Sequence, residues 1–203
     1  MWRDWIRTVE VEPSLYAADF AILGEQVDTL LRTGARIFHF DVGDGHFVPP
    51  VTVGPIVLQS IAPIVHQAGG DSVTFHIEAV ADVPATIAAA HARGLQVGVA
   101  FSPETAPEDV GAVAREADLV LCMSINPGYS GQSFMPEAIE RVRSVRALLP
   151  DRVHVQVDGG VGPDNVGELY AAGATLLVAG TAIFGREDLP RAYRRLVHLL
   201  ADA

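Results

Sequence analysis

The stretch QVGVAFSPETAPEDVGAVAREADLVLCMS, residues 96–124, contains a predicted strand, helix and second strand in succession. Its apolar runs, Gln96 to Phe101 and Leu119 to Ser124, are short and rich in Val, Leu and Phe, which is typical of buried strands. Between them, Pro107 to Glu116 has helical spacing and begins with proline, which the first turn of a helix tolerates best. We interpret this stretch as one unit of a parallel sheet covered by helices.

The same alternation runs along the whole chain. The predicted strands are Val9 to Tyr16, Arg36 to Val42, Ser72 to Glu78, Gln96 to Phe101, Leu119 to Ser124, Val153 to Asp158 and Leu176 to Ala179. The predicted helices are Phe20 to Thr33, Pro55 to Gln67, Val83 to Arg93, Pro107 to Glu116, Pro136 to Leu149, Pro163 to Ala172 and Pro190 to Leu200. No linker divides these units, so we predict one α/β domain over residues 1–203, a (β/α) barrel of the TIM type. With seven units instead of the usual eight, the chain is one unit short.

Composition and charge exclude several classes of protein. The chain has 14 Lys and Arg against 25 Asp and Glu, a net charge of −11, and no basic cluster, so we expect no nucleic-acid partner. Residues 45–70 contain no charged side chain, but their prolines and glycines predict a loop and one buried helix, and we expect no membrane partner. The single Cys122 excludes an internal disulfide framework. We expect a cytoplasmic protein.

Polar residues at the ends of predicted strands are the candidates for chemistry, because barrel active sites lie there. His39 and Asp41 are two residues apart, so their side chains point to the same face of a strand. An imidazole and a carboxylate suit a divalent cation such as Zn, Fe, Mn or Co, although such a pair is often only a hydrogen-bonded one. Asp158 ends another strand. His76 and Glu78 form a second same-face pair, for which a core interpretation stands beside a functional one.

Three glycine-bearing loops follow predicted strands. They are Asn126 to Gln132, Gly159 to Val161 and Gly180 to Gly185. Backbone N–H groups in such turns can hold a phosphate, and loops after the last two barrel strands often do so. Each signal is weak alone, but together they predict a phosphorylated ligand.

Asp41 and Asp158 could approach a bound substrate from opposite faces. One carboxylate would remove a proton while the other delivers one, and a cation held with His39 would stabilise the enediolate. The product is the epimer at that carbon. The chain contains no lysine, which excludes Schiff-base chemistry and weighs against an aldolase-type enzyme.

The chain closely resembles the ribulose-phosphate 3-epimerase family in motifs that follow in the family's order. These are Glu12-Pro13-Ser14 with Ala18-Asp19-Phe20, His39 to Pro49, Met123 to Gly128 with Gly131 to Phe134, Val157 to Val161 with Pro163-Asp164-Asn165, and Val178 to Gly185. The resemblance implies a ribulose-phosphate-binding barrel, interconversion of D-ribulose 5-phosphate and D-xylulose 5-phosphate, and one divalent metal cation.

The resemblance also implies roles for single residues. Asp41 would accept the proton and Asp158 would donate it, and both would ligate the metal with His39. The implied substrate-binding residues are Ser14, His39, Gly128, Tyr129, Ser130, Gly131, Asp158, Gly159, Gly160, Val161, Gly180 and Thr181.

The sequence departs from the family pattern in three ways. Gly43 stands where the family commonly has Met, and Ser130 and Thr181 are milder changes. More severely, the family's strand with an Asp-x-His-Leu-Met motif, whose His is a fourth metal ligand, is missing with its helix. Gly69-Gly70 lead directly into the predicted strand Ser72 to Glu78.

Loss of one unit leaves three structural outcomes open. The site works with three protein ligands and water, His76 takes the vacated ligand position, or the barrel opens and a second copy covers the edge, giving a homo-oligomer. The leading functional interpretation is a metal-dependent sugar-phosphate epimerase, acting on ribulose 5-phosphate or a close ketose phosphate. The alternative is a catalytically impaired barrel that still binds a phosphorylated sugar.

Overall fold

The computed structural model describes residues 9–65, 72–129 and 131–201. Its strands form one parallel sheet in the order β1-β6-β5-β4-β3-β2. The strands are β1 (Glu10–Pro13), β2 (Ser72–His76), β3 (Gln96–Phe101), β4 (Leu119–Met123), β5 (His154–Asp158) and β6 (Leu176–Ala179). Except at β1 beside β6, neighbours in the sheet are consecutive in the chain, as successive βα units require.

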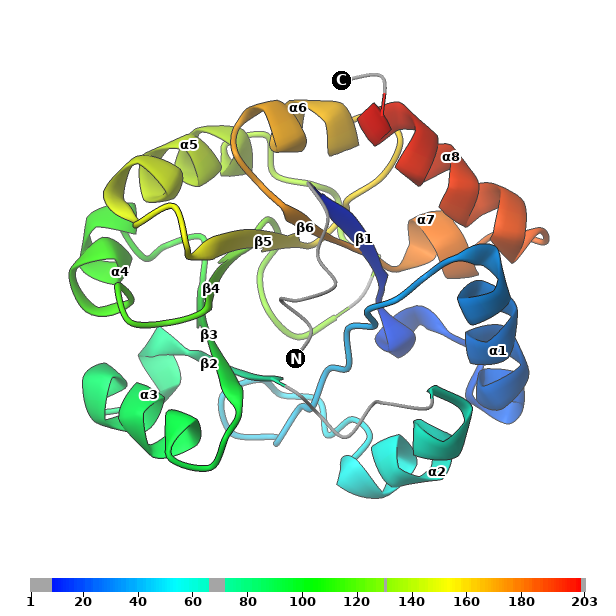
Figure 1. Ribbon diagram of the computed structural model, residues 1–203, viewed down its shortest axis with the longest axis horizontal. Helices are drawn as coiled ribbons and strands as arrows, with labels where there is room; N and C mark the ends of the chain where they lie inside the picture. Colours follow the sequence, from blue (N-terminus) through cyan, green and yellow to red (C-terminus); the bar gives the residue numbers. More distant parts are fainter. Residues whose placement is uncertain (1–8, 66–71, 130, 202–203) are drawn as a thin grey trace.

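Helices surround the curved sheet on its outer side (Figure 1). They are α1 (Leu23–Thr33), α2 (Pro55–Val65), α3 (Val83–His91), α4 (Pro107–Val113), α5 (Ala138–Leu148), α6 (Val166–Ala171), α7 (Thr181–Phe184) and α8 (Leu189–Ala201). Short 3₁₀ turns lie at Leu15–Ala17, Phe20–Ile22 and Ile77–Ala79. The arrangement confirms the predicted TIM-type (β/α) architecture.

Side chains that alternate in direction along the strands form two separate apolar layers. On β3 and β4, Val99, Phe101, Val120 and Cys122 belong to the large core cluster that also includes residues of α3 to α6 and α8. Ala100 and the alternate residues of β4 belong to a smaller cluster on the other side of the sheet. Successive strand side chains point to opposite faces, so the smaller cluster occupies the barrel interior and the large one lies between sheet and helices.

The predicted strand Arg36 to Val42 is wrong as a regular strand. The segment lies beside β1, where His39 N donates to Pro13 O at 3.1 Å and Leu15 N donates to His39 O at 2.9 Å, but the ladder is a single bridge between Ser14 and His39. The structure therefore has six strands in its described residues, with this extended segment in place of the seventh. Among the described residues, no strand pairs with the other side of this segment.

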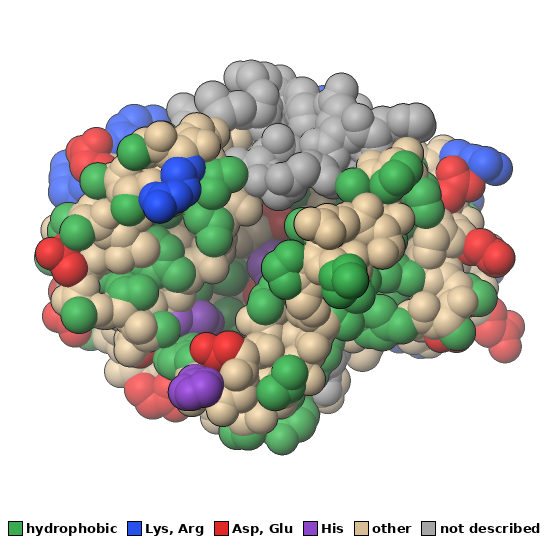
Figure 2. Space-filling view, turned by 90° about the horizontal axis from the view of Figure 1, so that it is seen from below, with side chains coloured by type: hydrophobic (Ala, Val, Ile, Leu, Met, Phe, Trp, Pro, Cys, Tyr) green, Lys and Arg blue, Asp and Glu red, His purple; other side chains and the backbone are tan. Residues whose placement is uncertain are grey.

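Among the residues that the structure describes, no strand pairs with the outer edge of β2 or links it to the segment 36–42 that carries His39. The view toward the side of α2 and α3 shows the surface hollowed between them, with histidine and acidic side chains visible inside (Figure 2). A cavity of about 780 Å³ reaches this opening, because Ser72 and Thr74 of β2 line it together with Phe38, Leu58 and Ile61. The open side is where a further βα unit would stand between α2 and β2.

The helix predictions are confirmed with shifted ends, most of all for Pro163 to Ala172, whose helix begins at Val166. The end of the predicted helix Pro55 to Gln67 lies outside the described residues. The four-residue helix α7 was not predicted, because one turn shows no periodicity in a sequence. None of the helices in the described ranges is long and apolar enough to cross a membrane.

Candidate active site

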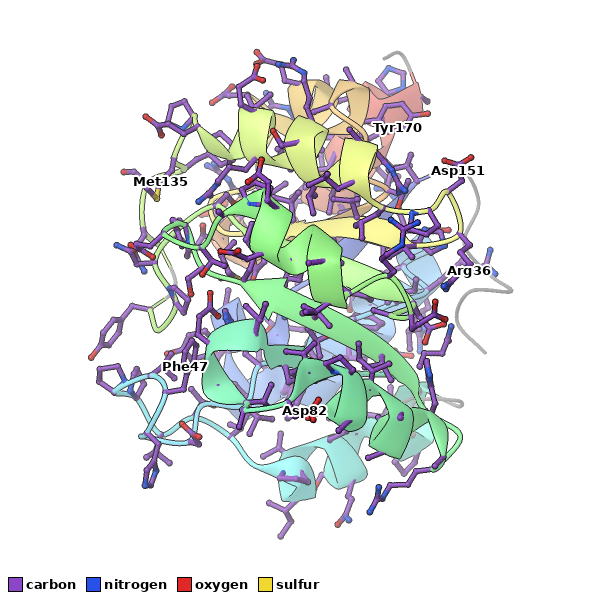
Figure 3. All side chains as sticks on the ribbon, turned by 90° about the vertical axis from the view of Figure 1, so that its left-hand side faces the viewer. Arg36, Phe47, Asp82, Met135, Asp151 and Tyr170 are labelled. Atoms are coloured by element: carbon purple, nitrogen blue, oxygen red, sulfur yellow. The ribbon has the colours of Figure 1, made fainter. Side chains whose placement is uncertain are left out.

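The carboxyl ends of the strands lie together at one end of the barrel. Figure 3 shows Phe47 and Met135, which follow Asp41 and β4, at one end, and Arg36 and Asp151, which precede His39 and β5, at the other. Parallel strands must all present the same end, so side chains that are far apart in the sequence converge here.

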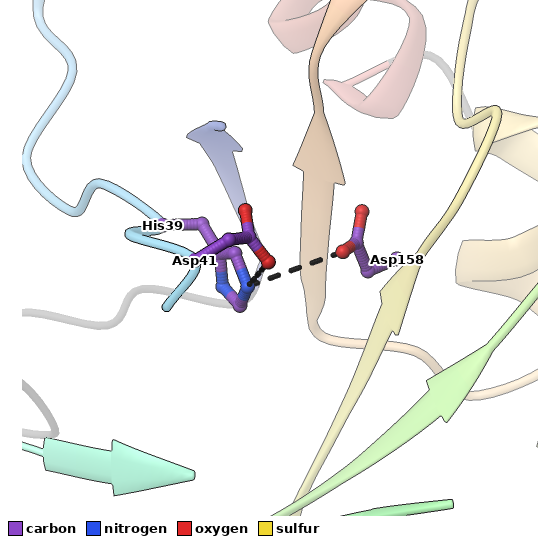
Figure 4. Close-up of side chains that lie close together, drawn as sticks. All are labelled: His39, Asp41 and Asp158. Atoms are coloured by element: carbon purple, nitrogen blue, oxygen red, sulfur yellow. Dashed lines mark hydrogen bonds and ion pairs between the residues drawn. The ribbon is translucent and has the colours of Figure 1, made fainter. Parts of the chain in front are cut away.

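Three predicted metal ligands converge at this end. His39 Nε2 lies 3.2 Å from Asp41 Oδ1 and 3.9 Å from Asp158 Oδ2, and one ligand atom from each residue falls within 4.8 Å of the others (Figure 4). His39 and Asp41 come from the extended segment beside β1, and Asp158 ends β5 across the barrel. One imidazole and two carboxylates are a donor set that suits a divalent cation.

The two aspartates differ in their electrostatic surroundings. Burial raises the pKa of Asp158 to about 6; His39 opposes this shift, and the charge of Asp41 adds to it. Burial also acts to raise the pKa of Asp41, but His39 and a hydrogen bond from Ser14 outweigh it and lower that pKa. Without a cation, Asp41 is therefore the ionised carboxylate and Asp158 the one that retains a proton more readily.

His39 is surrounded by acidic groups. Burial lowers the pKa of its imidazole, but Asp41, through charge and a hydrogen bond, and then Asp158 and Glu12 raise it to about 10. An imidazolium at this point neutralises part of the acidic cluster, and a cation bound at Nε2 would replace that positive charge.

Ser14 holds Asp41 in place. Its hydroxyl donates to Asp41 Oδ2 at 3.2 Å, and Ser14 itself is buried and lines the cavity. The loop after Asp41 is closed by Thr52, whose hydroxyl accepts from Gly43 N at 2.6 Å. A Cβ at Gly43 would lie 2.7 Å from Pro50 O, so this loop conformation favours glycine at position 43.

The glycine-bearing loops open into the same cavity. Its lining includes the predicted substrate residues Ser14, His39, Gly128, Tyr129, Gly131, Asp158, Gly159, Gly160, Val161, Gly180 and Thr181; Ser130 lies outside the described residues. Gln132 Nε2 donates to Asn126 O at 2.8 Å and to Tyr129 O at 2.9 Å, which fixes the first loop. Gly159 and Gly160 have φ of 118° and 64°, a conformation that glycine adopts without strain.

His76 does not join the three-residue cluster. Its Nδ1 lies 3.1 Å from Glu78 Oε2, and its ring lies against Phe47 with the ring centres 4.5 Å apart. Glu78 is itself held by Ser102 N at 2.8 Å. The arrangement gives no support to His76 as a replacement metal ligand, although His76 lines the cavity.

Two buried polar residues of the site were not predicted. Gln156 Nε2 donates to Glu12 Oε2 at 2.6 Å inside the barrel, and burial raises the pKa of Glu12 to about 7, with His39 acting against the shift. Their spacing in the sequence could have revealed them. Glu12 is two residues before Ser14 and Gln156 is two residues before Asp158, so each points to the same inward face of the barrel as that site residue.

Comparison with known proteins agrees with this geometry. The sequence model of the Ribulose-phosphate 3 epimerase family matches residues 10–68 and 61–184. The chain belongs to the ribulose-phosphate 3-epimerase family. Ribulose-phosphate 3-epimerase of Escherichia coli K12 is 40% identical over 202 residues, covering 88% of this chain and 90% of that protein. Ribulose-phosphate 3-epimerase 2 of Cupriavidus necator is 36% identical over 224 residues, covering 97% and 93%.

Solved structures show the same fold at low sequence identity. 3-Hexulose-6-phosphate synthase from Salmonella typhimurium superposes with a TM-score of 0.67 at 17% identity, over 96% of this chain and 99% of that one. KGPDC from Streptococcus mutans gives a TM-score of 0.67 at 12% identity, over 97% and 99%. These likenesses concern the fold alone.

The comparisons also locate the missing unit of this ribulose-phosphate 3-epimerase family member. The family match is split into two segments that both include residues 61–68, so this stretch of the sequence is matched to the family pattern twice. The 224-position alignment is longer than the 203-residue chain, which requires gaps on this side. Both observations agree with the expectation that about one βα unit of the family pattern is missing from this chain.

Proposed function

We propose that this chain is a metal-dependent epimerase that interconverts D-ribulose 5-phosphate and D-xylulose 5-phosphate. The observation that carries the proposal is the convergence of His39, Asp41 and Asp158 in the cavity lined by the three glycine-bearing loops. The family membership supports the same activity.

The unequal surroundings of the aspartates suggest their roles. Asp41, whose pKa is lowered, is the proton acceptor: it takes the C3 proton while the C–H electron pair moves into the C2 carbonyl to give an enediolate. Asp158, whose pKa is raised, donates a proton to the opposite face of C3 as the C2 carbonyl re-forms. The configuration at C3 is thereby inverted, and the two aspartates exchange protonation states.

His39, Asp41 and Asp158 would hold the cation. A bound divalent cation supplies stabilisation of the negative charge that develops on the substrate oxygens. Zn, Fe, Mn and Co all accept an imidazole and two carboxylates, so the donor set does not select one of them.

The glycine-bearing loops would hold the phosphate of the substrate. Positive-φ glycines at Gly128, Gly131, Gly159 and Gly160 turn the backbone sharply without side chains that would obstruct a ligand. Binding the phosphate away from C3 uses its binding energy to position the reacting carbon between the two aspartates.

The test is exchange at C3 in deuterated water. We expect the cation-loaded protein to incorporate solvent deuterium at C3 of D-ribulose 5-phosphate and to form D-xylulose 5-phosphate. Asp41→Asn and Asp158→Asn should each lower turnover by about 10²- to 10⁴-fold, the usual contribution of general acid–base catalysis. Asp151→Asn, at an exposed aspartate at the opposite end of the barrel, is the matched control and should leave turnover unchanged.

One observation favours a second function, that of a sugar-phosphate-binding barrel with little turnover. His39 and Asp41 sit on a segment joined to the sheet by one bridge, beside the open side of the barrel, so their placement is less constrained than that of Asp158. Binding of D-ribulose 5-phosphate without deuterium incorporation would favour this second function and would refute the epimerase.

A further inference from the structure

The imidazole of His39 has an acidic group at each of its two nitrogen atoms. Nε2 faces Asp41 and Asp158, the side on which a cation would bind. Nδ1, on the opposite edge of the ring, lies 4.0 Å from Glu12 Oε2. Among the residues that the structure describes, no other hydrogen-bond or ion-pair partner of Nδ1 is found. Glu12 is therefore placed to act on the ring from the side away from the cluster.

The strand register fixes this position of Glu12. On β1, Glu12 is level with Val178 of β6, which is level with Asp158 of β5. Glu12 and Asp158 thus occupy the same layer of the barrel interior on either side of β6. Gln156 holds the Glu12 carboxylate by a 2.6 Å hydrogen bond, and both side chains are buried. The carboxylate is consequently fixed within about one ångström of hydrogen-bonding distance from Nδ1.

We propose that Glu12 is a positioning residue of the cation site, holding the Nδ1–H of His39 so that Nε2 is presented to the cation. This inference rests on the cation site of the proposed function. Histidine ligands generally donate their second ring N–H to a carboxylate, a carbonyl or water, which fixes the tautomer and raises the basicity of the ligating nitrogen. Glu12 supplies that carboxylate, and Gln156 restrains it.

The competing explanation is that Glu12 only belongs to a buried polar layer. Glu10 provides the comparison, because it lies on the same face of β1, is also buried, and has an unpartnered Oε1. It is two residues farther from the His39 bridge and makes no ion pair with His39 in the described residues. Glu10→Gln and Glu12→Gln change the net charge and the buried carboxylate count equally, whereas only Glu12 lies beside His39 and accepts a hydrogen bond from Gln156.

The experiment is a direct titration of the metal-free protein with Co²⁺ and with Zn²⁺. We expect Glu12→Gln to weaken affinity for both cations by about 10- to 100-fold, the usual effect of losing such a partner. Glu10→Gln should remain within about twofold of the unmodified chain on the same principle. Thermal unfolding followed by circular dichroism checks that each variant is folded.

A second measurement does not depend on any variant. In the Zn²⁺-loaded unmodified chain, ¹⁵N NMR should show His39 with a protonated Nδ1 and a metal-bound Nε2. The opposite assignment would overturn the inference, as would a Glu12→Gln affinity within about twofold of the unmodified chain. If the unmodified chain binds neither cation, the cation site of the proposed function is refuted as well, so the two failures are distinguishable.

Discussion

Substitution of Gly159 tests whether the loop at Gly159 to Val161 requires glycine at its first position. Its φ is 118°, and a Cβ would lie 2.5 Å from Ile125 Cγ1 and 2.9 Å from Ile125 N. The two backbones cannot separate easily, because Ser124 N donates to Asp158 O at 2.7 Å and Ser124 Oγ donates to Gly159 O at 2.6 Å. An alanine at position 159 must therefore bear both backbone strain and a collision with a fixed backbone atom.

The expected cost of Gly159→Ala is the sum of these two effects. A non-glycine residue in such a conformation costs about 1–3 kcal/mol, and overpacking a buried site costs about another 1–3 kcal/mol. Their central sum is about 4 kcal/mol, a large part of the ~5–15 kcal/mol that stabilises an average domain. At roughly 2–4 °C per kcal/mol for a chain of this size, Tm should fall by about 8–16 °C.

The assay is thermal and urea unfolding of the unmodified chain and of Gly159→Ala, with Gly162→Ala as the matched control. A Cβ at Gly162 would meet its nearest neighbour, Ala182 Cβ, at 3.7 Å, an ordinary contact. Gly162→Ala should be neutral or stabilise by up to ~1 kcal/mol, since alanine restricts the unfolded chain. If Gly159→Ala and Gly162→Ala unfold at the same temperature and the same urea concentration, the argument that this loop requires glycine is refuted.

Two further predictions concern titrating groups. The pKa of Asp158, raised from 3.8 to about 6 in the folded metal-free protein, means that the folded state retains a proton that the unfolded state releases. The free energy of unfolding should therefore fall as pH rises from about 4 to 6. Urea unfolding across this pH range, in the presence of a chelator, should show this fall in the unmodified chain and a smaller fall in Asp158→Asn. If the free energy of unfolding depends on pH equally in both proteins, the assignment to Asp158 is contradicted. Burial raises the pKa of Cys122 to about 11. A thiol reagent at pH 8 should therefore leave the native protein unmodified and should label one thiol per chain after unfolding in urea. Rapid labelling of the native protein would contradict this burial.

Much of the fold could be predicted because each βα unit carries its own local pattern. The run at 96–101 and the run at 119–124 are apolar on both faces, as parallel strands between two layers must be, and the structure has β3 and β4 there. The segment 36–42 was predicted as a strand from its apolar residues but is not a regular strand, since pairing depends on a neighbour that the sequence of the segment does not reveal.

The site was predictable to a similar degree. His39, Asp41 and Asp158 converge as their positions at strand ends indicated. Glu12 was quoted only as part of a motif, because its interest lies in a contact with His39, 27 residues away in the chain. No local pattern contains that contact; it depends on β1 and the His39 segment lying side by side and on the register of the bridge between Ser14 and His39.

Only six residues separate the end of α2 from the start of β2 in the sequence, which bears on the size of deletion that this architecture tolerates. Each strand carries the chain toward the catalytic end of the barrel, and each helix returns it. Removing a strand together with a helix leaves the chain entering β2 from the same end as before, so β2 still pairs parallel to β3. Removing a strand or a helix alone would reverse the direction of every later strand. Whole strands and helices can therefore be lost from this fold only in strand–helix pairs if the later strands are to keep their direction, whereas loops can change length freely.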